Sequence, residues 1–209
     1  MMFTPGELFS DLPAASPDKD PITQFEEWFQ LARTANIYLA EAMTLATTSK
    51  DGFPSARIVL LKKVNQKGFV FFTNYESRKG VELESNPRAA LVLHWPVLER
   101  QIRIEGTVER ISKEESATYF QSRPRGSRIG AWASRQSREL GDRSELEERI
   151  RYYEEEYSDQ EVDLPAHWGG FRVIPERIEF WQGRESRLHE RLVFTKQPSG
   201  DWKSHLLFP

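Results

Sequence analysis

Residues 43–73, "MTLATTSKDGFPSARIVLLKKVNQKGFVFFT", decide the fold. Three runs rich in β-branched and aromatic residues are separated by the turn sequences "KDGFP" and "NQKG", a pattern that predicts consecutive antiparallel hairpins. The middle run, residues 55–63, has apolar residues on both faces and therefore predicts a central, buried strand. Later runs of similar kind predict further strands: "RAALVLHW", "ERQIRIEGTVERI", "GGFRVIP", "RIEFWQG", "RLHERLVFT" and "WKSHLLF".

Helix signals surround these strands. Asp20 before Pro21 predicts a helix start, because aspartate can accept from free first-turn amides and proline at the first position loses no hydrogen bond. Capping boxes at Ser112 and Ser144 predict later helices, and Pro124 divides the first of these into two short pieces. This order of elements predicts an α+β fold, mainly antiparallel β, with the sheet closed or nearly closed into a barrel and helices at one side.

Length and composition fit a single domain. The chain has 209 residues, 38% of them hydrophobic and 29% charged, without a composition break. Residues 1–19, rich in Pro, Ser, Ala and Asp, predict a flexible N-terminal arm, and residues 20–209 predict one domain. No apolar run is long enough to span a bilayer and the start resembles no signal peptide, so no membrane contact is expected and the predicted location is the cytoplasm.

Several chemistries lack their sequence signatures. The chain has no cysteine, which excludes disulfides, thiolate metal sites and thiol catalysis. Its four histidines are far apart and match no ligand spacing, so no metal site is predicted. Neither G-x-G-x-x-G after a strand, nor a P-loop, nor the G-x-S-x-G elbow of serine hydrolases is present.

Two segments place cations where an anion would stabilise them. In residues 180–194, "FWQGRESRLHERLVF", a strand would present Arg187, His189 and Arg191 as one cationic row; the alternative is an ordinary solvated sheet face. Ser77 is placed to cap a short helix whose first turn holds Arg78 and Lys79. Cations at a helix start are unfavourable unless an anion binds there, although a solvated surface remains the alternative.

Phosphate-capable side chains come from four separate segments and are enough for two phosphates. They are Arg57, Lys62, Arg78, Lys79, Arg123, Ser127, Arg187 and Arg191. The arginine-rich stretch 123–143 leaves open a second interpretation, a nucleic-acid-binding module. The net charge of -3 gives such a module little long-range attraction to a polyanion, so no nucleic-acid partner is expected.

Six motifs together resemble the pyridoxine (pyridoxamine) 5'-phosphate oxidases. They are "RIVLLK" (57–62), "FTNYESRKG" (72–80), "ERQIRIEG" (99–106), "YFQSRPRGSRIGAWAS" (119–134), "WGGFRV" (168–173) and "IEFWQGRESRLHER" (178–191). The resemblance covers nearly everything from residue 20 onward. It implies an FMN-dependent, Greek-key-like split β-barrel flanked by helices, which works as a homodimer with flavin sites at the interface.

The resemblance also implies roles for individual residues. Those implied to hold the FMN phosphate and its surroundings are Arg57, Thr73, Arg78 and Lys79; further implied cofactor contacts are Ile58, Val59, Leu60, Leu61, Lys62, Phe72 and Gln101. Implied to approach the same flavin, in part from the second subunit, are Gln136, Ser137, Trp181 and Arg191. The implied clamp on the substrate phosphate is Lys62, Tyr119, Arg123 and Ser127, with Arg187 and His189 as catalytic residues over the pyridine ring.

The implied reaction is oxidation of pyridoxine or pyridoxamine 5'-phosphate to pyridoxal 5'-phosphate, with hydride passing to the flavin and O2 reoxidising it to give hydrogen peroxide. The alternative within the fold is a related flavin oxidase of the phenazine type acting on another substrate. The chain departs from the family's usual pattern at Leu206, where arginine is expected, at Phe72, where tyrosine is common, and in lacking a basic N-terminal segment.

Overall fold

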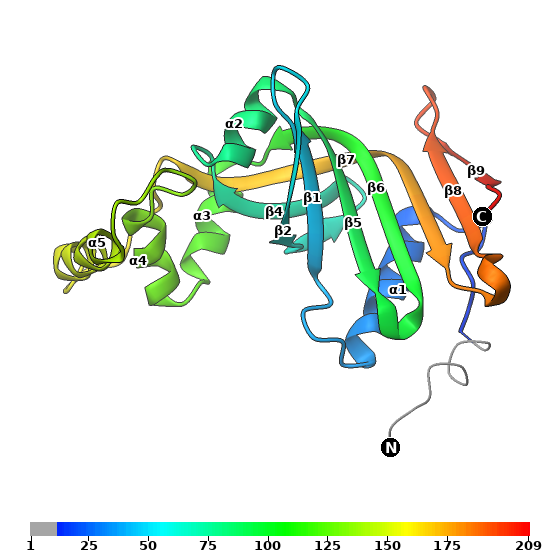
Figure 1. Cartoon of the computed structure of the whole chain (residues 1–209), viewed down its shortest axis with the longest axis horizontal. Coiled ribbons are helices and arrows are strands. Elements are labelled where there is room, and N and C mark those ends of the chain that lie inside the picture. Colours follow the sequence, from blue (N-terminus) through cyan, green and yellow to red (C-terminus); the bar gives the residue numbers. More distant parts are fainter. Residues whose placement is uncertain (1–11) are drawn as a thin grey trace.

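The computed structural model describes residues 12–209, which form a curled antiparallel sheet with helices around it (Figure 1). The sheet follows the order β2-β1-β5-β6-β7-β4-β3, and β8 and β9 continue from β7 on a separate branch. The strands are β1 (Ala42–Thr48), β2 (Pro54–Leu60), β3 (Lys63–Asn65), β4 (Gly68–Asn74), β5 (Arg88–Trp95), β6 (Arg100–Arg110), β7 (Trp168–Gln182), β8 (Glu190–Lys196) and β9 (Trp202–Leu206). The predicted antiparallel barrel-like fold is confirmed.

Strand β7 connects the two parts of the sheet. Its first half pairs with β4, from Asn74 opposite Trp168 to Phe69 opposite Val173. Its second half pairs with β8, and β6 runs beside both halves with a register shift between Glu105 and Gly106. The runs "GGFRVIP" and "RIEFWQG" therefore belong to one continuous strand, and the prediction of two is wrong, because the irregularity bends the strand without ending it.

Helix α1 (Pro21–Thr34) provides much of the main core. Its Phe25 ring meets Phe69 of β4 edge to face with ring centroids 4.8 Å apart, and Trp28 meets Phe180 of β7 at 5.2 Å. A smaller second core joins α3 (Lys113–Gln121), α4 (Arg125–Ala133) and the segment after α5 (Arg143–Glu156). The remaining elements are α2 (Arg78–Ser85) and the single turns η1 (Pro96–Leu98) and η2 (Glu185–Arg187).

The helix starts follow local hydrogen bonds. Asp20, Ser77 and Ser112 cap α1, α2 and α3 as predicted, each accepting from a first-turn amide. The prediction of a cap at Ser144 is wrong, since Asp142 accepts from the Ser144 amide at 2.8 Å and the helix begins one residue after this aspartate. Because Asp142 accepts from the Ser144 amide, the helix already includes Ser144, and this serine cannot be its N-cap.

Residues 55–63 do not form a central strand, and that prediction is wrong. Strand β2 is the outermost member of its side of the sheet, and Ile58 on it is 63% exposed. The strand ends at Leu60, and β3 starts at Lys63. Lys62 lies in the break, so simple alternation along a strand does not fix its direction relative to Arg57. In a regular strand, residues five apart point to opposite faces. Because the strand is interrupted between them, Arg57 and Lys62 can lie on the same side of the molecule.

The expected N-terminal arm, residues 1–19, lies in part outside the described residues, which begin at Leu12. Leu12 and Ala15 pack against the main core. Arg100 donates to the Pro13 carbonyl at 2.5 Å, and the Ser16 amide donates to the Gln24 side chain at 2.8 Å. Within residues 12–209, no helix combines the length and apolar character needed to cross a membrane.

Candidate active site

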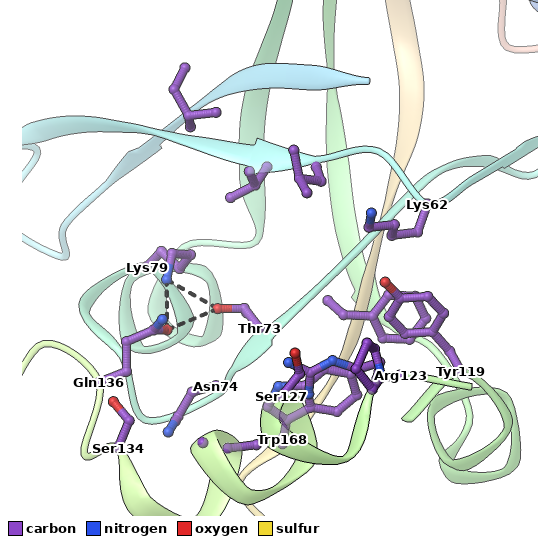
Figure 2. A pocket seen from close by; sticks show the side chains of 17 residues that line it. Lys62, Thr73, Asn74, Lys79, Tyr119, Arg123, Ser127, Ser134, Gln136 and Trp168 are labelled. Atoms are coloured by element: carbon purple, nitrogen blue, oxygen red, sulfur yellow. Dashed lines mark hydrogen bonds between the residues drawn. The ribbon is translucent and has the colours of Figure 1, made fainter. Parts of the chain in front are cut away.

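A pocket of about 600 Å³ lies between strands β2 and β4 and the helices of the second core. Figure 2 shows Lys79 and Gln136 on one side of it and Lys62, Tyr119 and Arg123 on the other. The structure brings together eleven of the predicted site residues here: Ile58, Val59, Leu60, Lys62, Phe72, Thr73, Lys79, Tyr119, Arg123, Ser127 and Gln136. The pocket thus has two polar ends, each with cations, joined by apolar strand residues.

One end holds the predicted clamp. Helices α3 and α4 meet at a bend around Pro124, which places Tyr119 and Arg123 before the bend and Ser127 after it. The Arg123 guanidinium lies 4.7 Å from the centroid of the Trp168 ring. Burial lowers the pKa of Arg123, and its buried Nη1 has no hydrogen-bond acceptor among residues 12–209. An anion in the pocket would satisfy this donor.

An aromatic stack supports this end of the pocket. The Phe72 ring stacks on Tyr119 with centroids 3.9 Å apart and on Trp168 at 5.4 Å. Phenylalanine at position 72 therefore fills a packing role for which no hydroxyl is required. Trp168 was not predicted as a site residue, although it opens the "WGGFRV" motif. A strand-initial tryptophan gives no signal of its own in the sequence, because its ring partners come from two distant segments, β4 and residues 119–123.

The other end is centred on Lys79 in the first turn of α2. Its Nζ donates to Thr73 Oγ1 at 3.0 Å and to Gln136 Oε1 at 3.0 Å (Figure 2). It also donates to Ser77 Oγ at 3.1 Å. Burial and the charge of Arg57 lower the pKa of Lys79 to about 8, while Glu82 acts in the opposite direction. Within residues 12–209 no carboxylate forms an ion pair with this ammonium. It is a half-buried cation at a helix N-terminus, where an anion is favoured.

Arg57 and Arg78 lie beside Lys79 and share one acceptor, Glu82. Arg57 Nη2 lies 3.1 Å from Glu82 Oε2, and Arg78 Nε lies 2.9 Å from Glu82 Oε1. Burial alone would raise the pKa of Glu82, but hydrogen bonds from Ser55, Thr47, Arg78 and Arg57 outweigh it and lower the pKa to about 2. Neither arginine lines the pocket itself. The sequence signal for this carboxylate is its position four residues after Arg78 on the same helix, a spacing at which side chains are neighbours.

Other predicted residues lie elsewhere. Leu61 is buried in the main core, and Ser137 follows Gln136 with a left-handed backbone, φ 68°. Gln101, Trp181 and Arg191 form a cross-strand row on β6, β7 and β8, with Gln101 opposite Trp181 and Trp181 opposite Arg191. In Figure 1 this branch lies at the opposite end of the sheet from α3 and α4. One chain therefore does not gather all the predicted cofactor residues around one pocket.

The predicted strand with Arg187, His189 and Arg191 on one face is wrong. The backbone turns through η2, where Ser186 and Arg187 have φ of 55° and 61°, and β8 begins only at Glu190. Of these three residues, only Arg191 lies in strand β8. Left-handed backbone at two consecutive residues breaks the alternation on which the expected row depended.

The three side chains make different contacts. His189 Nδ1 lies 3.2 Å from the Arg184 amide that donates to it, and the His189 ring packs 4.6 Å from Trp181. Arg191 Nε donates to the buried Glu179 at 2.8 Å, and this hydrogen bond raises the pKa of Arg191. Arg187 is exposed at the tip of the turn. His189 and Arg191 thus both border Trp181 across the chain reversal, His189 through its ring and Arg191 as the cross-strand neighbour.

The arginine-rich stretch is largely bonded within the protein. Arg125 donates to the Tyr157 carbonyl at 2.5 Å, and Arg128 lies 3.0 Å from Glu161. Arg143 pairs with Glu147 at 3.5 Å, and Arg123 lines the pocket. This stretch therefore serves internal contacts and the pocket, which does not favour a separate surface for nucleic acid.

Fold and site together define a split-barrel protein whose pocket has two cationic ends. A solved structure of PhzG from Burkholderia lata, in complex with tetrahydrophenazine-1-carboxylic acid, superposes with a TM-score of 0.88 at 30% identity, covering 93% of this chain and 95% of that one. A pyridoxamine 5'-phosphate oxidase-related, FMN-binding protein from Nostoc punctiforme shares the fold, with a TM-score of 0.74, 16% identity, and coverage of 93% of this chain and 100% of that one.

Sequence comparison gives the family. Residues 33–157 match the family described as pyridoxamine 5'-phosphate oxidase, and residues 168–209 match the pyridoxine 5'-phosphate oxidase C-terminal dimerisation region. A pyridoxine/pyridoxamine 5'-phosphate oxidase of Cupriavidus necator is 56% identical over 91% of this chain and 89% of its own length. One from Psychromonas ingrahamii is 58% identical over 87% and 83%. The chain belongs to the pyridoxamine 5'-phosphate oxidase family.

Proposed function

We propose that the protein is an FMN-dependent oxidase that converts pyridoxine or pyridoxamine 5'-phosphate to pyridoxal 5'-phosphate. The observation that carries the proposal is the pocket with two cationic ends, one at Lys79 and one at Arg123. Two phosphorylated ligands side by side require two such ends, and the relatives at 56% and 58% identity bear the name of this activity.

The residues at the Lys79 end fit a flavin phosphate. A half-buried ammonium without an ion-pair partner among residues 12–209, at the N-terminus of α2 and beside two guanidiniums, suits a dianion. Thr73 and Gln136 would add neutral hydrogen-bonding groups. Bound there, the flavin would supply the redox chemistry, accepting hydride from the substrate and passing electrons to O2.

The residues at the Arg123 end would hold the substrate phosphate. Arg123 Nη1, the exposed Lys62 and the hydroxyls of Tyr119 and Ser127 supply a charge-assisted clamp. Holding the phosphate at a fixed distance from the flavin would orient the substrate ring, so its contribution to the rate would be largely one of positioning. Arg187 and His189 would complete the site over the substrate ring.

The active form would be a homodimer in which each flavin site uses residues of both copies. Trp168 lines the pocket, whereas Trp181 lies 13 residues further along the same strand, about 40 Å away if the strand were straight. One flavin would therefore not reach both ends of β7 within one chain, since the β8 branch and the pocket helices α3 and α4 lie at opposite ends of the sheet (Figure 1). The match of residues 168–209 to a dimerisation region supports a second copy as the source of Trp181 and Arg191. A cytoplasmic location stays a prediction from the sequence.

The test is a half-reaction. The FMN-reconstituted protein is mixed without oxygen with pyridoxine 5'-phosphate, and the visible flavin absorption is followed. We expect bleaching that air reverses, with pyridoxal 5'-phosphate and hydrogen peroxide formed. A bound flavin that stays oxidised with both pyridoxine and pyridoxamine 5'-phosphate would contradict the proposed substrate. Failure to bind FMN would contradict the cofactor.

Complementation tests the shared site. Lys79→Met impairs one half of the proposed site and Arg191→Ala the other. If each site takes its halves from two copies, mixed dimers of the two variants contain one intact site. Activity should then rise when the two inactive variants are mixed and allowed to exchange subunits, which purely intrachain sites would not permit.

A phenazine-type substrate is the second candidate, suggested by the 30% identical PhzG structure. It is the weaker one because the clamp at Lys62, Tyr119, Arg123 and Ser127 provides charge for a phosphate. Reduction of the bound flavin by a dihydrophenazine carboxylic acid, but not by either phosphorylated vitamer, would favour it.

A further inference from the structure

Glu82 occupies an unusual position for a carboxylate next to a site for anions. It lies on α2 with its side chain 6% exposed, one turn from Lys79. Its Oε2 accepts from Thr47 Oγ1 at 2.5 Å and from Ser55 Oγ at 2.6 Å. A buried carboxylate is costly unless its hydrogen bonds are satisfied, and here both oxygens are occupied.

The same carboxylate holds two arginines that come from different elements. Arg57 of β2 bonds Oε2 at 3.1 Å, and Arg78 of α2 bonds Oε1 at 2.9 Å. Arg57 is fixed further by Thr47 and Ser55, each 2.5 Å from one of its terminal nitrogens. In contrast, the Arg78 side chain is 61% exposed and its contact with Glu82 uses only Nε. The hydrogen bond from Nε to Glu82 orients the planar guanidinium and thereby sets the direction of the two terminal nitrogens of Arg78.

Glu82 does not neutralise the phosphate end. Three cations, Arg57, Arg78 and Lys79, face one carboxylate, which leaves a net charge of about +2. The ammonium of Lys79 bonds only neutral oxygens among residues 12–209. The end therefore keeps enough charge for a dianion while two of its three cations are held in fixed orientations.

We propose that Glu82 is a positioning residue that orients Arg57 and Arg78 around the phosphate end of the pocket and so gives the protein its preference for a phosphorylated flavin. The inference rests on the proposed function, since it assigns a role at the same flavin site. Glu82 touches no ligand itself. It acts through the two arginines.

Charge and position predict opposite results for the same substitution. Glu82→Gln removes a negative charge beside an anion site, so electrostatics alone would tighten phosphate binding. If Glu82 orients the arginines, the variant should bind phosphate more weakly, because an amide offers one acceptor where two guanidiniums need two. Glu82→Asp keeps the charge but shortens the side chain, so it isolates position from charge.

The experiment measures FMN and riboflavin binding by the flavin-free full chain, using quenching of flavin fluorescence. The ratio of the riboflavin to the FMN dissociation constant reports the phosphate contribution, since riboflavin lacks the phosphate. For Glu82→Gln and Glu82→Asp we expect this ratio to fall about tenfold or more, which is about 1.4 kcal/mol. Riboflavin affinity should be nearly unchanged. The matched control is Glu84→Gln, an exposed carboxylate on the same helix that pairs with Arg110 at 2.6 Å; it should leave the ratio unchanged.

Failure of the inference and failure of the proposed function look different. A wild-type protein without preference for FMN over riboflavin would contradict the flavin site itself. A wild-type preference that Glu82→Gln preserves or increases would overturn the positioning role. If the Glu82 variants do not fold, Ser55→Ala removes a hydroxyl that donates to Glu82 and accepts from Arg57, without changing charge; an unchanged ratio in that variant would overturn the inference equally.

Discussion

The lowered pKa of Lys79 predicts how flavin phosphate binding depends on pH. In the free protein this pKa is about 8, because of burial and the charge of Arg57. A phosphate dianion bonds the charged ammonium and raises its pKa toward or above the ordinary value of about 10.4. Above pH 8 the free protein must therefore take up a proton in order to bind.

The size of the effect follows from this linkage. Between the free and bound pKa values the association constant falls about tenfold per pH unit, so at pH 9 FMN should bind about tenfold more weakly than at pH 7. Below about pH 6 the phosphate itself gains a proton, and affinity falls there as well. The pH profile should be bell-shaped, with its alkaline side set by Lys79.

Fluorescence titrations of FMN at pH 7, 8 and 9 measure the profile, and riboflavin titrations at the same pH values serve as the control. Lys79→Arg stays charged over this range, so its alkaline decline should disappear. Lys79→Met should bind FMN weakly at every pH, with no alkaline decline. A wild-type dissociation constant that is flat from pH 7 to pH 9, or an alkaline decline that persists in Lys79→Arg, would refute the reasoning.

Four further substitutions test other parts of the molecule. Arg123→Met should raise KM for pyridoxine 5'-phosphate about tenfold or more while FMN affinity stays within about twofold, because Arg123 belongs to the other end of the pocket. Arg187→Ala should lower kcat more than it weakens FMN retention, measured by steady-state kinetics and flavin titration. Asp20→Ala should lower the free energy of unfolding in urea by about 1 kcal/mol through loss of the α1 cap. Gly106→Ala should destabilise by about 1 to 3 kcal/mol or more, because an added Cβ would lie 2.0 Å from the Ile174 carbonyl oxygen.

Each of these has a contrary result. Loss of flavin from Arg123→Met would place Arg123 at the cofactor end, and release of flavin from Arg187→Ala with unchanged turnover in the remaining holoenzyme would do the same for Arg187. An unchanged urea midpoint for Asp20→Ala would show that the α1 cap does not contribute to the stability of the protein. A fully stable Gly106→Ala would mean that β6 and β7 can separate at the register shift without cost.

Signals carried by a few neighbouring residues predicted their structures well. The caps at Asp20 and Ser77 and the helical break at Pro124 each depend on hydrogen bonds within one turn, which the sequence displays directly. The failure at Ser144 is local too: Asp142 with Glu145 also has capping-box spacing, and the earlier residue takes the amide. Local rules find a helix start but do not choose between two overlapping signals.

The position of residues 55–63 in the sheet could not be derived in this way. Apolar residues on both faces are expected of a strand covered on both sides, and also of an edge strand whose apolar side chains line a ligand pocket. Here the second case holds, since Ile58, Val59 and Leu60 line the pocket. The sequence pattern shows that the strand is apolar on both faces, and it does not show whether the protein core or an open pocket lies against each face.

The cationic side chains fall into two groups, which differ in the local backbone structure that sets their direction. Lys79 and Arg123 line the pocket as expected, because Lys79 lies in the first turn of a helix and Arg123 lies at the break between two helices, and the sequence defines both features. Arg187 and His189 did not form a row, because their direction depends on two left-handed residues in a turn that alternation cannot anticipate. Residues in a chain reversal between two strands take their direction from the turn, and they can move with it when a ligand binds. The strand pattern therefore places Arg191 in β8 but cannot place Arg187 or His189, and their proposed role over the substrate ring stays a prediction.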